Sequence, residues 1–366
     1  MEEGLIMRFL LIILIFLHGL IHLAGFLKSF GFINLEEISH DISKPIGVLW
    51  LISTLLFFAT GILYLLGKDS WIIPATLAIV ISQLLIILTW QDAKFGTIPN
   101  VIILLSIIIG FFVWSFNHQV SQEIKSIKEE NFTKEIITAQ ELNSLPPQVK
   151  QWLQNIGLVG KEKIHTVYFK QKGTMKLKPD QDKWSDALAE QYITTDKPAF
   201  IWKVKMEMSP FVKVAGRDYF VDGEGKMLMK VASLIPVVNV SHNTKVNQST
   251  LQRFLLELPW YPSMALSPFI TWEEVNEHSA RATMTYKGTS GSAVFHFDNN
   301  GDLLKVSAYR YKENGDNAEL IECVGEVKEN TVIEGIKIPT NLHVSWVLDE
   351  GLFTWYRLEI YDVNFN

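Results

Sequence analysis

Apolar residues are concentrated in the first third of the chain, where they form four long runs. The runs cover Leu10–Leu27, Pro45–Leu66, Trp71–Trp90 and Pro99–Phe116. Each approaches the roughly 20 residues that a helix needs to cross the hydrocarbon core of a membrane. The first run is too long for a signal-peptide core and is followed by more spans. The pattern predicts a bundle of four transmembrane helices over residues 1–118, hence a multi-pass integral membrane protein with the lipid bilayer as a partner.

A charged connector and a β-rich domain follow the apolar runs. The segment Ser121–Glu141 is charged and free of proline and glycine, which predicts a solvated helical connector over residues 119–144. The string Leu145-Pro-Pro-Gln-Val-Lys-Gln-Trp-Leu starts a short helix with proline in its first turn and Gly157 as its stop. A soluble domain is expected over residues 145–366.

Alternating apolar and polar positions dominate the chain after Gly160, which is typical of strands. Between Gln248 and Leu258 the apolar spacing becomes helical, and strands then resume. About eleven or twelve strands with one or two helices are expected. The predicted fold is an α+β domain with a large curled antiparallel sheet, a half-barrel, and one or two helices on its concave side. The expected strands are 163–178, 187–194, 200–208, 212–221, 225–231, 270–274, 280–286, 292–298, 303–311, 318–328, 336–348 and 353–364.

Composition and motifs exclude several classes of function. The formal net charge of −6 disfavours nucleic acid as a partner. The single cysteine, Cys323, excludes an intramolecular disulfide and a cysteine-rich metal site. The domain histidines are dispersed, so no metal site is predicted there. The sequence has no P-loop, no nucleophile elbow and no dinucleotide fingerprint. We therefore expect no cofactor, and no residue set specifies a reaction.

Three polar residues in the predicted membrane bundle are candidates for function. His18 and His22 are four residues apart and project from one face of the first span. Ionisable residues inside a membrane are functional candidates, and this pair could bind a metal ion. It could equally hydrogen-bond neighbouring helices. Asp92, in the loop before the fourth span, could pair with Lys94 or face a substrate path.

The predicted helix of the soluble domain ends in a second group of candidates. Arg253 and Glu257 are one helical turn apart, and Trp260 and Tyr261 follow. Arg253 could anchor an anionic head group while Trp260 lines an acyl pocket. Alternatively, Arg253 and Glu257 form an ordinary ion pair.

The pair Arg217-Asp218 lies on a predicted strand, near Trp202 on the strand before it. Adjacent strand residues point to opposite faces, so only one of the pair can face a shared cavity. We expect Arg217 to pair with Glu257 in a buried network. Trp202 could line a ligand or belong to the core.

Several strings resemble a family of uncharacterised bacterial membrane-anchored proteins, known only as a domain of unknown function. The resemblance covers about 220 residues in order and implies no activity. The string His18-Gly-Leu-Ile-His-Leu-Ala-Gly25 is similar to the leader region of the multi-span members. The matching strings begin at Leu145, Ala189, Phe200, Gly216, Asp222, Arg253, Trp260, Trp272, Phe295, Ile338 and Trp346.

A second resemblance is to the periplasmic lipoprotein-carrier fold. It rests on Pro198-Ala-Phe-Ile-Trp-Lys203, a strand, and Tyr219-Phe-Val-Asp-Gly-Glu-Gly225. That fold is a half-barrel whose concave face holds acyl chains, so the resemblance implies an extracytoplasmic domain. The positive-inside rule points mildly the other way. Five basic residues flank the spans on the domain side and three on the other: Arg8, Lys68, Lys125, Lys128 and Lys134 against Lys28, Lys44 and Lys94. We favour the extracytoplasmic side, since long domains translocate largely regardless of charge.

The sequence thus leads to one hypothesis and two alternatives. The leading hypothesis is a membrane-anchored, non-catalytic protein that holds an apolar or lipid-like ligand, such as an acyl chain, in its curled β-domain. The first alternative is an enzyme acting on a membrane-associated substrate, with Asp218, Arg253 and Glu257 converging. The second is a membrane sensor or redox component that uses His18 and His22.

Overall fold

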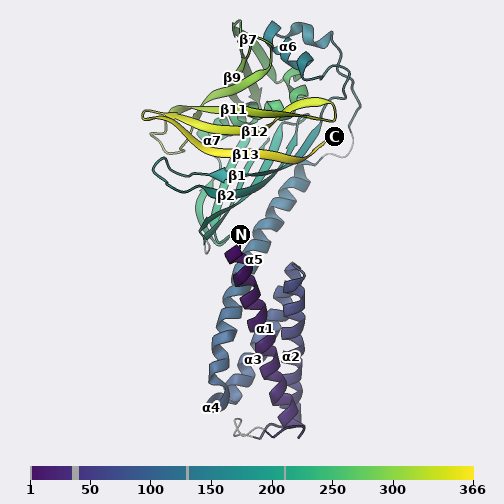
Figure 1. The fold of residues 1–366 in the computed structure, drawn as a ribbon, viewed down its shortest axis with the longest axis vertical. Helices are drawn as coiled ribbons and strands as arrows, with labels where there is room; N and C mark the ends of the chain where they lie inside the picture. Colours follow the sequence, from purple (N-terminus) through teal and green to yellow (C-terminus); the bar gives the residue numbers. More distant parts are fainter. Residues whose placement is uncertain (1, 35–40, 129–131, 210–211) are drawn as a thin grey trace. The chain divides into compact units, whose positions relative to one another are not determined.

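A computed structural model describes residues 2–34, 41–128, 132–209 and 212–366 of the chain (Figure 1). The chain divides into two compact units, Met1–His118 and Gln119–Asn366. Helix α5 (Thr97–Ile127) crosses from the first unit into the second.

The first unit is helical, as the apolar runs predict. Besides α5 it contains α1 (Glu2–Ser29), α2 (Lys44–Leu65) and α3 (Ile72–Leu88), with short turns η1 (Asp69–Trp71), α4 (Trp90–Ala93) and η2 (Lys94–Gly96). Among the described residues, four helices are long and apolar enough to cross a membrane. Small residues let α1 and α2 pack closely. A Cβ on Gly25, for example, would come within 2.8 Å of Trp50 Cγ.

The connector is helical only in part. Helix α5 continues to Ile127, beyond the expected span end at Phe116. Residues 132–140 are not helical, and Ile136 pairs with Glu162 in an antiparallel bridge. A short turn, η3 (Glu141–Ser144), precedes helix α6 (Pro147–Asn155). The helix expected throughout 119–144 is therefore absent from its described second half. There the backbone finds partners in the domain, such as the pair Ile137 N to Lys161 O.

The second unit is built on one antiparallel sheet of thirteen strands among the residues described. Its order is β6-β5-β4-β3-β2-β1-β13-β12-β11-β10-β9-β8-β7. The first arm contains β1 (Thr166–Met175), β2 (Ser185–Thr194), β3 (Ala199–Ser209), β4 (Val212–Val221), β5 (Glu224–Val231) and β6 (Ile235–Val240). The second arm contains β7 (Ile270–Asn276), β8 (Ser279–Tyr286), β9 (Thr289–Phe297), β10 (Leu303–Tyr311), β11 (Leu320–Ile333), β12 (Ile336–Leu348) and β13 (Gly351–Phe365).

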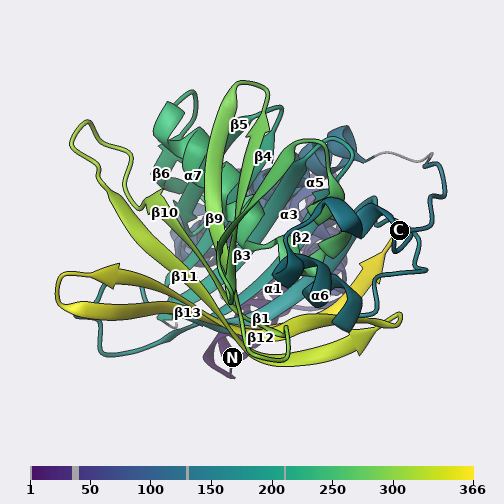
Figure 2. The ribbon, with the colours of Figure 1, turned by 90° about the horizontal axis from the view of Figure 1, so that it is seen from above.

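The sheet curls around the chain segment that joins its two arms (Figure 2). This segment is helix α7 (Thr244–Leu256), followed by turns η4 (Leu258–Trp260) and η5 (Pro262–Leu266). The side chain of Asn243 caps α7 by accepting from the backbone N–H groups of Lys245 and Val246. Strands β6 and β7 are the two edges of the sheet, so it is curled but unclosed. The predicted half-barrel with a helix on its concave side is confirmed.

Glycines let α7 sit between the two arms. The helix packs on β4 and β5 on one side and on β8, β9 and β10 on the other. A Cβ on Gly225 of β5 would lie 2.9 Å from Val246 O, and one on Gly291 of β9 would lie 2.6 Å from Gln252 Cγ. The arms also touch directly, since Thr289 Oγ1 donates to Gly223 O at 2.9 Å. Helix and hairpin contacts together hold the open sheet in its curled form.

Candidate functional site

Arg253 on α7 is the centre of a buried polar cluster on the inner face of the sheet. Its Nε donates to Glu257 Oε1 at 2.7 Å, and one terminal nitrogen donates to Asp218 Oδ2 at 2.6 Å. The other terminal nitrogen lies 3.4 Å from Gln191 Oε1. Gln191 in turn donates to Glu257 Oε2 at 2.6 Å. Each nitrogen of the Arg253 guanidinium thus has a partner: Glu257, which directly follows α7, Asp218 on β4, or Gln191 on β2.

The aromatic rings of β3 flank the same guanidinium. The Arg253 Cζ lies 4.9 Å from the ring centre of Phe200 and 4.8 Å from that of Trp202, within cation–π range. Burial alone would lower the pKa of Arg253, but the carboxylates of Glu257 and Asp218 outweigh it and hold the pKa above its usual value. Arg253 is therefore a permanent cation in this cluster.

A second hydrogen-bonded group adjoins the cluster through Trp202. Gln171 Oε1 accepts from the Trp202 indole N–H at 2.8 Å and from the Tyr356 hydroxyl at 3.0 Å. Burial raises the pKa of Tyr356, so its hydroxyl keeps the proton that it donates. The polar groups of β1, β3 and β13 are thus joined to those around Arg253.

The geometry changes the interpretation of the charged candidates. Asp218, Arg253 and Glu257 do converge, as the enzyme alternative requires, but their charges are engaged with one another. One guanidinium faces two carboxylates, which disfavours the anionic head group considered for Arg253. The structure contradicts the expected Arg217–Glu257 pair. Arg217 points to the other face of β4, where its Nε lies 3.0 Å from Glu123 Oε2. The alternation of side chains along a strand explains the difference.

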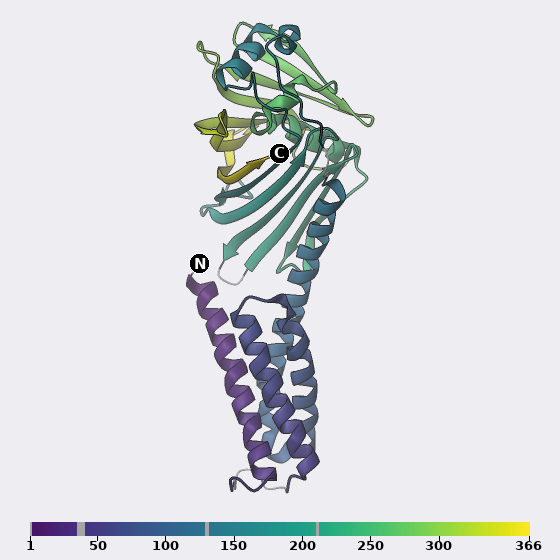
Figure 3. The same ribbon diagram turned by 90° about the vertical axis from the view of Figure 1, so that its right-hand side faces the viewer.

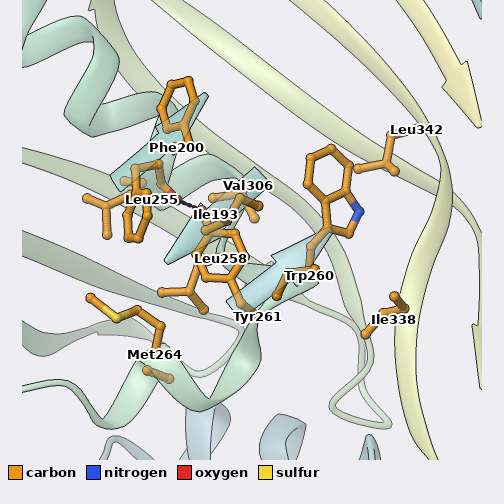
Figure 4. Packing of buried hydrophobic residues seen from close by; sticks show 14 of the residues in the cluster. Ile193, Phe200, Leu255, Leu258, Trp260, Tyr261, Met264, Val306, Ile338 and Leu342 are labelled. Atoms are coloured by element: carbon orange, nitrogen blue, oxygen red, sulfur yellow. Dashed lines mark hydrogen bonds between the residues drawn. The ribbon is translucent and has the colours of Figure 1, made fainter. Parts of the chain in front are cut away.

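Trp260 and Tyr261 are core residues. Trp260 Nε1 donates to Pro339 O at 2.9 Å, and the Tyr261 hydroxyl donates to Phe254 O at 2.6 Å. Figure 4 shows Trp260 toward Leu342 and Ile338 within the apolar cluster. Tyr261 is completely buried. Both side chains fix the segment after α7 against the sheet.

Small residues and methionines line the inner face of the first arm beyond the Arg253 cluster. Across strands β1 to β4, two sets of paired residues face inward: Gln171, Ala189, Val204 and Gly216, and then Gly173, Ala187, Met206 and Val214. Met175, Met227 and Met229 face the same way on the neighbouring strands. The outward-facing residues between these rungs include Lys172, Leu188 and Lys205. We call the inner set Ala187, Ala189, Met175, Met206 and Met229 the methionine face.

The methionine face is packed by the chain's own side chains. Ala187, Met175 and Met206 are each exposed by 3% or less. Met229 is half-buried and packs against the main core. Methionine side chains are unbranched and adaptable, so they fill such a space without a rigid fit.

His18 and His22 lie together inside the helical unit. His18 Nε2 lies 3.0 Å from Asn100 Oδ1 and 3.3 Å from Ser82 Oγ, and His22 Nδ1 donates to His18 O at 2.8 Å. The contacts of His18 join α1 to α3 and α5, which is the hydrogen bonding to neighbouring helices considered for this pair, whereas the bond of His22 stays within α1. Within the described residues, no group of three or more His, Cys, Asp or Glu could hold a metal ion. Asp92 is half-buried in α4.

Sequence reasoning missed three members of the polar cluster: Gln171, Gln191 and Tyr356. Both glutamines occupy inward positions on strands whose other inward residues are apolar or small. A glutamine at such a position could have been found from the alternation alone. Tyr356 carries no comparable signal, since a tyrosine in a strand is ordinary core composition.

Comparison with known proteins places the soluble unit in a family. Residues 143–365, more than half of the chain, match DUF6920, described as a family of unknown function. The chain belongs to DUF6920. This confirms the resemblance to an uncharacterised domain family. No curated protein matches the sequence.

Among solved structures, this chain is similar to the crystal structure of the LolA superfamily protein NE2245 from Nitrosomonas europaea. The sequences are 11% identical, the TM-score is 0.33, and the match covers 63% of this chain and 94% of that one.

Proposed function

We propose that this DUF6920 protein is a membrane-anchored binding protein that holds an apolar, lipid-like ligand against the methionine face. The observation that carries the proposal is the composition of that face. Small residues and methionines line the inside of an open, curled sheet, beside polar groups that already satisfy one another. Apolar sites of this kind, with a few fixed polar groups, are typical of pockets for apolar ligands.

The ligand enters by displacing methionine side chains. The face is filled in the structure, so binding requires the methionines to change rotamer, which their three rotatable bonds permit. The Arg253 cluster bounds the face on the side of α7. It has a formal charge of −1 from one guanidinium and two carboxylates. An uncharged or cationic end group is therefore preferred over an anionic one.

One further feature supports a membrane setting. Four helices have the length and apolar composition of membrane spans, and we propose that they anchor the protein in a bilayer with the domain on the extracytoplasmic side. The domain would then remain beside a source of lipid. The enzyme alternative gains no specific support, because its three charged side chains are engaged with one another.

Native mass spectrometry of the full-length protein tests the binding proposal. The protein is purified in a mild detergent and mixed with deuterated diacylglycerol or phosphatidylethanolamine. We expect one lipid to survive collisional activation on the wild type. Ala189→Phe, which fills the methionine face, should lose it. Leu188→Phe is the matched control because Leu188 is the neighbouring outward residue and is 60% exposed.

Lipids held by the membrane helices would be common to all three proteins, so the difference reports on the domain. Thermal unfolding of each variant establishes that the sheet is intact. Equal lipid retention by the wild type and both folded variants would rule out this face as the binding site.

A further inference from the structure

Hairpins of the first arm turn alternately at two ends of the sheet. The last residues of β1, β3 and β5 and the first residues of β2, β4 and β6 lie at one end, and the β2–β3 and β4–β5 turns lie at the other. In Figure 3 the teal strands of this arm end together at one edge. The two ends of the arm are therefore made of different residues and can have different surface properties.

Apolar side chains are exposed at the first end. We call this set the apolar rim: Leu177 (42% exposed), Met208 (45%), Val212 (36%), Ile235 (59%) and Val237 (56%). Leu177 directly follows β1, Met208 is near the end of β3, Val212 begins β4, and Ile235 and Val237 are in the first half of β6, so the rim is a shared feature of that end. Exposed apolar clusters on a soluble domain mark interaction surfaces. The two turns at the opposite end consist of Thr195-Asp196-Lys197-Pro198 and Asp222-Gly223.

Charge also separates the two ends. Residues 176–184, 207–213 and 230–235 contain five lysines and three acidic residues, whereas 194–199 and 221–225 contain one lysine and three acidic residues. Lysines beside exposed apolar side chains suit an anionic lipid surface, because the apolar groups enter the interface while the ammonium groups meet the head groups. The acidic turns would be repelled from the same surface.

We propose that the apolar rim docks on the surface of an anionic lipid bilayer. A bilayer is the partner we propose because the same chain contains four helices of membrane-spanning length. Covalent connection to these helices would keep the domain near the bilayer. The lysine-rich composition supplies the charge complementarity. This docking would hold even if the methionine face bound no lipid, since it depends only on the exposed residues of the rim.

Nitroxide accessibility in nanodiscs tests the docking on the full-length protein. Cysteines are introduced at the rim as Ile235→Cys and Leu177→Cys, and at the opposite end as Lys197→Cys. The native Cys323 is fully buried, and labelling of the wild type sets the background. A nitroxide is attached to each cysteine in nanodiscs of phosphatidylcholine with phosphatidylglycerol. For each label, accessibility to oxygen is divided by accessibility to a water-soluble nickel complex. We expect this ratio to be severalfold higher for the rim labels than for the Lys197→Cys label.

Two comparisons make the result specific. The oxygen preference of the rim labels should fall in nanodiscs of phosphatidylcholine alone, and also when Lys176, Lys178 and Lys213 are changed to glutamate. Rim labels as open to nickel as the Lys197→Cys label would overturn the proposal. Rim labels shielded from both reagents would also overturn it, since they would show that protein covers the rim. Neither readout depends on a ligand inside the sheet.

Discussion

The single positive charge of Arg253 is paired with two negative charges. Its single positive charge lies between Asp218 and Glu257, whose side chains are 7% and 12% exposed. Removing one member of a buried ion pair leaves the other uncompensated and strongly destabilises a fold. Here, loss of Arg253 leaves two carboxylates facing each other.

Arg253→Met should therefore lower the free energy of unfolding by about 3–5 kcal/mol. Denaturant unfolding of the full-length protein, followed by tryptophan fluorescence, measures the change. Arg281→Met is the matched control. Arg281 lies in an exposed pair with Glu273 at 3.8 Å, so its loss should cost no more than about 0.5 kcal/mol. A similar small effect for Arg253→Met would show that the cluster is not an essential buried network.

Because of Cys323, the free energy of unfolding should fall as the pH rises into the alkaline range. Burial raises the pKa of its thiol above the ordinary value for cysteine, with Arg310 opposing the shift. The folded protein thus keeps the proton to higher pH than the unfolded chain. The resulting stability is complete below about pH 9 and is lost as the pH rises towards the folded-state pKa.

Alkylation with iodoacetamide at pH 8, followed by mass spectrometry, should leave Cys323 unmodified in the folded protein and modify it in denaturant. Cys323→Ala should flatten the decline of stability above pH 9. Rapid alkylation of the native protein would contradict the burial of this side chain.

At the scale of elements, α7 depends on two glycines. Gly225 and Gly291 face it from opposite arms of the sheet, and a Cβ on either would contact α7. Overpacking of this kind typically costs 1–3 kcal/mol. The helix therefore fits its place because two strands lack side chains there.

We expect Gly225→Ala and Gly291→Ala each to lower the free energy of unfolding by about 1–3 kcal/mol. Gly315→Ala is the control, because no atom lies within 4 Å of a Cβ at Gly315. Equal melting temperatures for all three variants would mean that α7 adjusts its position freely.

The element order could be predicted from the sequence more fully than the site. Alternation in the strands and helical spacing in α7 are local signals, and they were sufficient for the half-barrel. Strand β6 was missed because Pro236 and the short length of Ile235–Val240 weaken its pattern. The second half of the connector was expected to be helical because its composition is charged. In the structure its backbone instead forms hydrogen bonds with residues that are distant in the sequence.

The partners of the charged residues were harder to predict because they depend on register. Arg217 and Asp218 are adjacent, and a shift of one residue would exchange their faces. No local pattern told which of the two would meet Arg253. Gln191 reaches the cluster from a strand far away in sequence. Such pairings follow from the assembled sheet.

At the scale of the whole molecule, the membrane setting predicts a labelling pattern. A four-span bundle places both of its ends on one side of the bilayer, with the loop that contains Phe95 on the other. We expect Asn300→Cys to react with a membrane-impermeant maleimide in intact cells. Phe95→Cys, at an exposed position, should react only after permeabilisation. The reverse pattern would put the domain in the cytoplasm.

The pairing of β1 with β13 sets the order of events during synthesis. These two strands join the arms at the middle of the sheet, and the backbone N–H groups of His165 and Thr166 both donate to Asn366 O. Strand β13 follows β1 to β12 in the sequence, so during synthesis the two arms cannot be joined until it has emerged. During that time one edge of β1 stays unpaired. A cell making this protein must therefore keep a half-finished sheet from aggregating until β13 is available to join the two arms.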